Sequence, residues 1–113
     1  MRRALADGYR KRLADTEDLI LPQDAPGHVY HLFAVGIRGG AKRRDHIAAQ
    51  LHKAGVGVGF HYPVAVHQMS LYPAQRPLPI TESLCESMIS LPLFPGMRED
   101  ELDTVAAALL EAL

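Results

Sequence analysis

The chain lacks several features that would assign a protein to a compartment or class. Cys85 is the one cysteine among 113 residues, so an internal disulfide is excluded and a reducing, cytoplasmic setting is expected. No apolar run approaches the roughly 20 residues that a membrane-spanning helix needs. The charged N-terminus is unlike a signal peptide. We therefore expect a cytoplasmic chain with no membrane association.

A charge excess of either sign is also missing. The 12 Lys and Arg residues and the 13 Asp and Glu residues leave a formal net charge of −1. This balance gives no global attraction to nucleic acid or to an anionic membrane. Basic residues gather at positions 2–12 and 42–44, which we interpret as solvated helix faces. The length and the 48% hydrophobic content predict one domain, residues 1–113, with its own core.

Apolar periodicity predicts a mixture of helices and strands. Helices are expected at 1–14, 42–55, 80–90 and 95–113, and strands at 28–37, 56–62 and 90–94. The strand at 28–37 is apolar on both faces, as expected in the middle of a sheet. Four prolines between residues 63 and 79 predict a long ordered loop, with one helical turn near 66–71. This order indicates a two-layer α/β (α+β) sandwich with a small sheet.

Single residues suggest where some helices begin and end. Asp45 is expected to be a cap or first-turn acid of the helix at 42–55, and Gly55 its left-handed C-terminal cap. Thr81 is the expected N-cap of the helix at 80–90. Leu84, Cys85 and Met88 are expected to face inward from that helix.

The stretch GFHYPVAVHQMSLYP, residues 59–73, contains two histidines that raise the question of a metal or catalytic site. His61 and His67 lie six residues apart, which does not match a helical metal-ligand pair, and no cysteine or carboxylate is near in sequence. Cys85 is expected in the core, and no serine has a nucleophile-elbow context. We therefore predict no metal site and no catalytic residue.

Other candidates for cofactor chemistry are equally poor. Lys11, Lys42 and Lys53 lie on polar helix faces or in a turn, whereas a Schiff-base lysine needs an apolar setting that lowers its pKa. The glycines at 55–59 follow a helix and precede a strand, the reverse of a dinucleotide-binding fingerprint. What remains is His61-Tyr62-Pro63, where a strand enters a loop. Two interpretations stay open: a ligand-facing role, or a histidine hydrogen-bonded within the fold.

Three segments in this order resemble one known family: HVYHLFAV, then RRDHIAAQLHKAGVGVGFHYPVAVHQMSLY, then LPITESLCESMISLPLFPGMREDELDTVAAAL. The pattern is similar to the C-terminal small domain of the DegT–DnrJ–StrS sugar aminotransferases. The matching positions are His31-Leu32-Phe33, Arg44-Asp45, His61-Tyr62-Pro63, His67, Tyr72, Pro79, Glu82, Ser90-Leu91-Pro92-Leu93 and Pro95. The stretch between Tyr72 and Pro79 is shorter than is usual in the family, which leaves substrate choice open.

The resemblance implies a PLP-dependent enzyme of the aspartate-aminotransferase fold (PLP fold type I). Such enzymes transfer an amino group, usually from glutamate, to a nucleotide-linked keto sugar in amino-sugar and polysaccharide biosynthesis. The family's Schiff-base lysine and PLP site belong to a large domain that this chain does not contain. The helix at 1–15 would connect to that domain, and the whole enzyme would be a homodimer. The chain alone is then expected to bind no PLP and to be inactive.

The resemblance also assigns roles around the two histidines. It implies that His61, Tyr62 and Pro63 face the nucleotide-sugar substrate, and that His67 and Tyr72 support the loop. A competing hypothesis is a stand-alone binding or dimerisation module derived from this domain. A third is a remnant without function.

Overall fold

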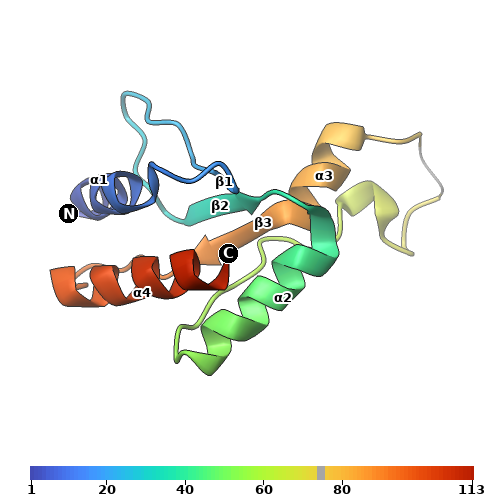
Figure 1. Cartoon of the computed structure of the whole chain (residues 1–113). Coiled ribbons are helices and arrows are strands. Elements are labelled where there is room, and N and C mark those ends of the chain that lie inside the picture. The colour runs from blue at the N-terminus through green and yellow to red at the C-terminus, as the bar shows by residue number, and fades with distance from the viewer. Residues whose placement is uncertain (74–75) are drawn as a thin grey trace.

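The computed structural model describes residues 1–73 and 76–113. The helices are α1 (Arg2–Leu13), α2 (Gly40–Lys53), the 3₁₀ helix η1 (Val66–Gln68), α3 (Pro79–Ser87) and α4 (Glu99–Ala112). The strands are β1 (Leu19–Ile20), β2 (Phe33–Ile37) and β3 (Met88–Leu91). They form an antiparallel sheet in the order β1-β2-β3, so the strand that is apolar on both faces is indeed central. Helices α1, α4 and α2 lie next to one another along this sheet (Figure 1).

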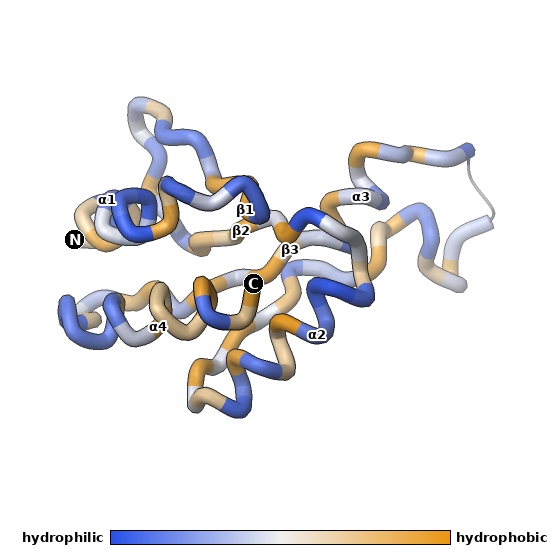
Figure 2. The backbone as a smooth tube through the Cα atoms, in the orientation of Figure 1, coloured by the Kyte–Doolittle hydropathy of each residue, from blue (hydrophilic) through white to orange (hydrophobic). Residues whose placement is uncertain are grey.

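The core lies between these helices and one face of the sheet. Val35 on β2 is opposite Ile89 on β3, and both are fully buried. From α1, the Tyr9 ring stacks on Phe33 with ring centroids 5.0 Å apart. The Tyr9 hydroxyl donates a hydrogen bond of 2.7 Å to the carbonyl oxygen of Pro92. Along α2, apolar and polar stretches alternate from one helical turn to the next (Figure 2). This is the predicted two-layer α/β sandwich.

The predicted helix ends are partly right. Helix α2 begins at Gly40 with Gly39 as its N-cap at φ +109°, so Asp45 lies beyond the first turn and the prediction of a cap there is wrong. Gly55 follows the C-cap residue with φ +81°, as its left-handed role predicted. Helix α4 begins after Arg98, whose backbone N–H donates to the Glu101 carboxylate at 2.8 Å. Three acidic residues in that first turn suit the helix dipole.

The strand predicted at 28–37 begins only at Phe33. Tyr30 adopts a left-handed backbone conformation with φ +48°, and its N–H donates to Nδ1 of His28 at 3.0 Å. The guanidinium of Arg2 donates to the carbonyl oxygen of His31 at 2.9 Å. Residues 28–32 therefore bond to themselves and to α1, where the local pattern had predicted sheet pairing.

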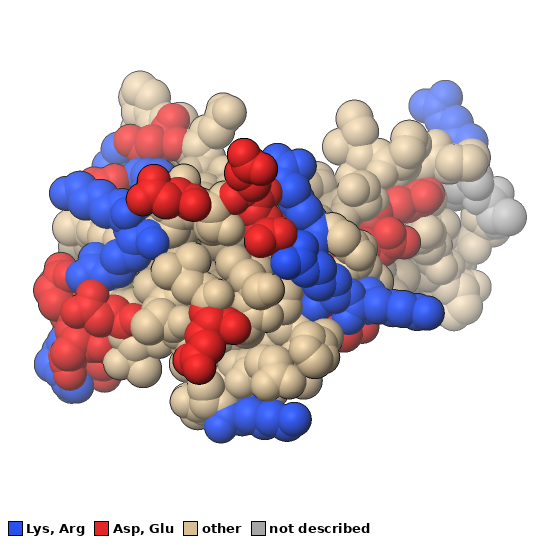
Figure 3. All heavy atoms as spheres, viewed as in Figure 1, with Lys and Arg blue, Asp and Glu red and all other residues tan. Residues whose placement is uncertain are grey.

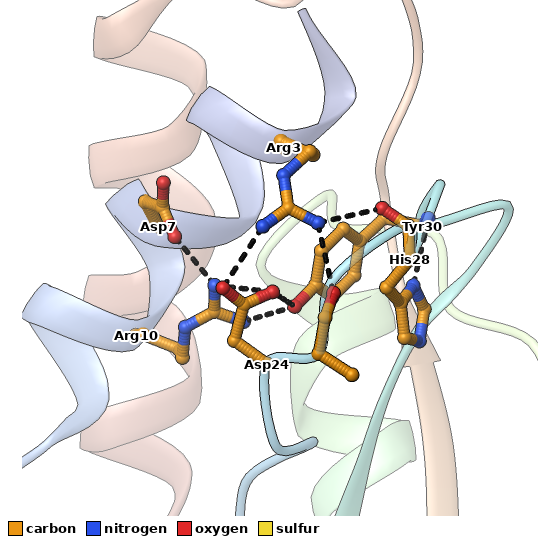
Figure 4. Close-up of polar contacts among 7 residues, drawn as sticks. Arg3, Asp7, Arg10, Asp24, His28 and Tyr30 are labelled. Atoms are coloured by element: carbon orange, nitrogen blue, oxygen red, sulfur yellow. Dashed lines mark hydrogen bonds and ion pairs between the residues drawn. The ribbon is translucent and has the colours of Figure 1, made fainter.

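Hydrogen bonds and ion pairs connect this loop to α1. They involve Arg3 and Arg10 of α1 and Asp24 and Tyr30 of the loop (Figure 4). The Tyr30 hydroxyl accepts a hydrogen bond from Arg10 at 2.7 Å and donates one to Asp24 at 2.5 Å. That bond from Tyr30 is the largest cause that lowers the pKa of the Asp24 carboxyl. Arg3 donates to Asp24 at 2.9 Å and to the carbonyl oxygen of His28 at 2.8 Å.

Two further predictions around residue 60 and α3 need correction. The strand expected at 56–62 is reduced to one bridge, in which Gly59 and Ser90 exchange backbone hydrogen bonds of 3.1 and 2.8 Å. Helix α3 has Leu78 as its N-cap residue, not Thr81, and it ends before β3. No residue of α3 is buried, because its apolar side chains face outward or lie at the edge of the core.

The fold therefore has two parts. We call residues 61–73 and 76–87 the arm, and residues 1–60 and 88–113 the body. The arm contains η1, which is the helical turn predicted near 66–71, while residues 74 and 75 of the predicted loop lie outside the described residues. The arm projects from one end of the sheet (Figure 1), and the radius of gyration is 14.8 Å. A compact chain of roughly 100 residues has a radius of gyration of about 13 Å.

Charges are distributed unevenly over these two parts. Side chains of both signs are spread over the visible face of the body, whereas the arm shows mainly uncharged residues (Figure 3). Among the described residues, we find no helix whose length and apolar character would suffice to cross a bilayer.

Candidate functional site

His61 lies where the body meets the arm. Its Nδ1 atom is 2.9 Å from the hydroxyl oxygen of Ser90, one of two polar residues buried in the described structure. The imidazole lies over Gly59, where a Cβ atom would be only 2.8 Å from Cε1 of the ring. The glycine thus permits a close approach, as glycine inside a strand often does. Here the approaching group is the ring of His61 itself.

Tyr62 and His61 form one wall of a hollow. The Tyr62 ring meets the imidazole edge-on, with centroids 5.5 Å apart and planes at 74°, and the residue is 72% exposed. Thr81, Leu84, Cys85 and Met88 complete the lining of this hollow, which has a volume of about 200 Å³. We call it the His61 hollow. Pro63 follows Tyr62 on the exposed surface and does not line it.

His67 connects η1 to the start of α3. Its Nε2 atom lies 2.8 Å from Oε1 of Glu82, and the same oxygen accepts the backbone N–H of Leu78 at 3.0 Å. The hydrogen bond with His67 is the main cause that lowers the pKa of the Glu82 carboxyl. The sequence did not identify Glu82 as the partner of His67, because the two residues are 15 positions apart.

Tyr72 has a more open environment than His67. It is 51% exposed, and its backbone N–H donates to the carbonyl oxygen of Met69 at 3.0 Å. Together with His67, Arg76 and Thr81 it lines a second hollow of about 490 Å³. The structure thus brings His67 and Tyr72 together in one hollow and His61 and Tyr62 in another, and Thr81 borders both.

Arg44 is a buried charged residue to which sequence reasoning gave no role. It lies on α2, is 7% exposed, and reaches the backbone of α3 and the ring of Phe60. Its place as Arg44-Asp45 in a recurring pattern was the one signal in the sequence. The pattern did not reveal that its partners would be Phe60 and Cys85.

The described residues offer little for metal or Schiff-base chemistry. No three His, Cys, Asp or Glu side chains among them lie together as a metal site would require. Lys11, Lys42 and Lys53 are all exposed on helices α1 and α2, and none of them lines the hollows beside His61 or His67. The groups that converge near His61 are an imidazole, a phenol, a hydroxyl and apolar carbons. Such a set suits binding of an uncharged or hydroxyl-rich ligand.

Comparison with known proteins gives consistent matches. A model of the DegT/DnrJ/EryC1/StrS aminotransferase family matches residues 1–110. The chain is 33% identical over 116 residues to the UDP-N-acetyl-3-dehydro-α-D-glucosamine 3-aminotransferase of Acidithiobacillus ferrooxidans. That alignment covers 99% of this chain and 30% of the relative.

Solved structures agree with this match. The chain superposes on DesV of S. venezuelae, solved in complex with a ketimine intermediate, with a TM-score of 0.87 and 34% identity over 97% of this chain. NtdA of Bacillus subtilis, solved with bound cofactor PMP, gives a TM-score of 0.88 and 30% identity over 98% of this chain. These matches cover 30% of DesV and 27% of NtdA, so the chain spans less than a third of the length of each relative.

Proposed function

Because the chain belongs to the DegT/DnrJ/EryC1/StrS aminotransferase family, we propose that it is the C-terminal small domain of a PLP-dependent sugar-nucleotide aminotransferase. The whole enzyme would transfer an amino group, with glutamate as donor, to a keto sugar linked to a nucleotide. One observation carries the proposal: nearly the whole chain matches about 30% of a relative named for that reaction on a UDP-linked sugar. The setting would be amino-sugar biosynthesis in the cytoplasm.

The cofactor would be held outside this chain. PLP supplies the electron sink for amino transfer, and it needs a lysine in a shielded pocket together with groups that hold its phosphate. The three lysines here are exposed, so the chain's own residues do not fit a PLP site. We infer that a large domain supplies both the lysine and the phosphate-binding groups, that helix α1 leads to this domain, and that residues 1–113 alone bind no PLP and are inactive.

The contribution of this chain would be a wall of the substrate site. Ser90 engages Nδ1 of His61, and no described residue engages Nε2, so that ring nitrogen can meet an oxygen of the sugar or the phosphate. Tyr62 and Pro63, both exposed next to it, would complete this wall. His67, through Glu82, and Tyr72 would support the loop that follows. The apolar side chains exposed on the arm would be covered by the large domain of a homodimeric enzyme.

The test is to express the chain together with the coding sequence upstream of Met1. The longer product should show a PLP Schiff-base absorption band and should aminate a UDP- or dTDP-linked keto sugar with glutamate as donor. Residues 1–113 purified in parallel should show neither. Transamination by the short chain, or a longer product that binds no PLP, would overturn the proposal.

Variants of the longer enzyme then test the assigned wall. His61→Ala should raise KM for the nucleotide sugar and leave PLP binding unchanged, because His61 would meet only the substrate. Ser83→Ala, on the exposed surface of α3, is the matched control and should behave like wild type. If His61→Ala had no effect while His67→Ala abolished activity, the roles of the two histidines would be reversed.

A stand-alone binding or dimerisation module is the second candidate, and the exposed apolar residues of the arm favour it. Leu71 is 88% exposed and Ile80 is 78% exposed, and surfaces of this kind commonly mark an interaction site. Light scattering on residues 1–113 separates the two candidates. A tight symmetric dimer would support the module, whereas a monomer at all concentrations would exclude dimerisation as its function.

A further inference from the structure

Ser90 and Arg44 are both buried, and each contacts a residue that lines the His61 hollow. Ser90 contacts the imidazole of His61 directly, and Arg44, on the first half of α2, reaches the backbone of Cys85. Burial of a guanidinium is unfavourable unless its charge and its N–H groups are matched by partners. The identity of those partners therefore indicates what the buried arginine does.

The guanidinium of Arg44 makes three different contacts. One terminal N–H donates to the carbonyl oxygen of Cys85 at 2.6 Å, and Nε donates to the Asp45 carboxylate at 2.9 Å. The central Cζ atom lies 4.6 Å from the centre of the Phe60 ring, a cation–π distance. Cys85 is in the last turn of α3, where carbonyl groups lack partners within the helix and a cation suits the helix dipole.

Two of these partners belong to the two sides of the His61 hollow. Phe60 directly precedes His61, whereas Cys85 is itself a lining residue on the α3 side. One planar side chain therefore contacts both the segment that presents the imidazole and the helix that faces it. A lysine has a single compact ammonium group and cannot reproduce a flat stack and a directed fork together.

We propose that Arg44 is a positioning residue that sets the separation of His61 from α3. Its meaning for substrate binding rests on the function proposed above, but its geometric consequence exists in the chain itself. Loss of the Phe60 stack frees the segment that leads to His61. Loss of the Cys85 contact frees the end of α3, so the hollow loses its defined width.

The experiment compares isotope-labelled residues 1–113 as wild type, Arg44→Lys, Arg44→Met and the control Arg43→Lys. Arg43 is a neighbour on α2 that pairs with Asp18 at 2.8 Å and has no contact with the hollow. NMR records the His61 ring resonances and the backbone amides of α3, and a thiol reagent reports the accessibility of Cys85. Denaturation of each variant establishes that it is folded.

Arg44→Lys should remain folded, shift the His61 ring resonances and make the Cys85 thiol react faster, while Arg43→Lys matches wild type. Arg44→Met should give larger shifts; if it unfolds, Arg44→Lys decides. A folded Arg44→Lys with unchanged His61 resonances and Cys85 reactivity would overturn the proposal. In the longer enzyme, Arg44→Lys should lower kcat/KM by up to about 100-fold, as small misplacements of binding groups can.

These results are distinguishable from a failure of the proposed function. A longer product that does not transaminate would remove the aminotransferase function and leave the His61 and Cys85 measurements intact. An active enzyme whose His61 ring is insensitive to Arg44→Lys would remove the positioning role alone.

Discussion

The body and the arm both contain many apolar side chains but differ in what surrounds them. In the body, Tyr9, Phe33 and Leu51 are completely buried. In the described part of the arm, Ala65 is the one buried residue, and Leu71 and Ile80 are largely exposed. The body therefore contains the contacts that stabilise the chain. We expect the apolar residues of the arm to contribute little to the folding of the chain, in agreement with the domain contact proposed for them above.

The largest expected effect on stability comes from truncating a large side chain in the core of the body. Phe33→Ala should lower the free energy of unfolding by about 3–5 kcal/mol, because it leaves a cavity under the ring of Tyr9. Leu71→Ala, at a residue that is 88% exposed in the arm, is the matched comparison and should change it by less than about 0.5 kcal/mol. Urea denaturation measures both, and equal losses would remove the distinction between body and arm.

A smaller effect is expected from one hydroxyl in the body. Tyr9→Phe removes the donor to the half-buried carbonyl of Pro92 and should cost about 0.5–1.5 kcal/mol. Burial raises the pKa of Tyr9, so its neutral form is favoured in the folded state. The resulting stability is present below the ordinary tyrosine pKa of about 10 and is lost as pH rises above it.

The same prediction has a counterpart in the arm. Tyr72→Phe, at a residue that is 51% exposed, should leave the unfolding free energy unchanged. Denaturation midpoints between neutral and alkaline pH measure both variants. A wild-type chain with the same alkaline dependence as Tyr9→Phe would contradict the assignment to Tyr9.

The smallest expected effect is confined to the arm. The pKa of Glu82 is lowered in the folded chain, chiefly by its hydrogen bond with His67. The stabilisation from this contact is therefore present above the ordinary glutamate pKa and is lost as pH falls through the lowered value. Amide resonances of η1 should shift in that acidic range while those of β2 stay constant.

Two variants identify the group responsible for that transition. Glu82→Gln should shift the η1 resonances already at neutral pH and remove their acidic transition. Glu86→Gln, an exposed position on the same helix, should preserve it. A transition that persists in Glu82→Gln would assign it to another group.

The sequence predicted the helices of the body well because each has its own apolar periodicity. The left-handed turn at Tyr30 escaped prediction, since it depends on Arg2 and Arg3, more than 20 residues away in the chain. The inward face expected for α3 was wrong for a related reason. Apolar periodicity predicts that one face of a helix will be buried, but it does not identify the part of the protein that packs against this face.

The site was predictable only in part. The position of His61 after a glycine-rich segment indicated a strand end, but the structure has only the isolated bridge between Gly59 and Ser90 before it. His61 contacts Ser90, and Arg44 contacts Phe60 and Cys85, across long distances in the sequence. No local sequence pattern encodes such contacts. The roles assigned to His61, Tyr62 and Pro63 remain predictions.

Gly59 has a consequence for how mutational data on this chain would be understood. A methyl group at this position would displace the imidazole of His61, which is the mobile end of a side chain, and would leave the core untouched. A library that selects for solubility or folding would therefore accept alanine at position 59. A library that selects for the substrate binding proposed for His61 would reject it, although residue 59 has no side chain to touch a ligand.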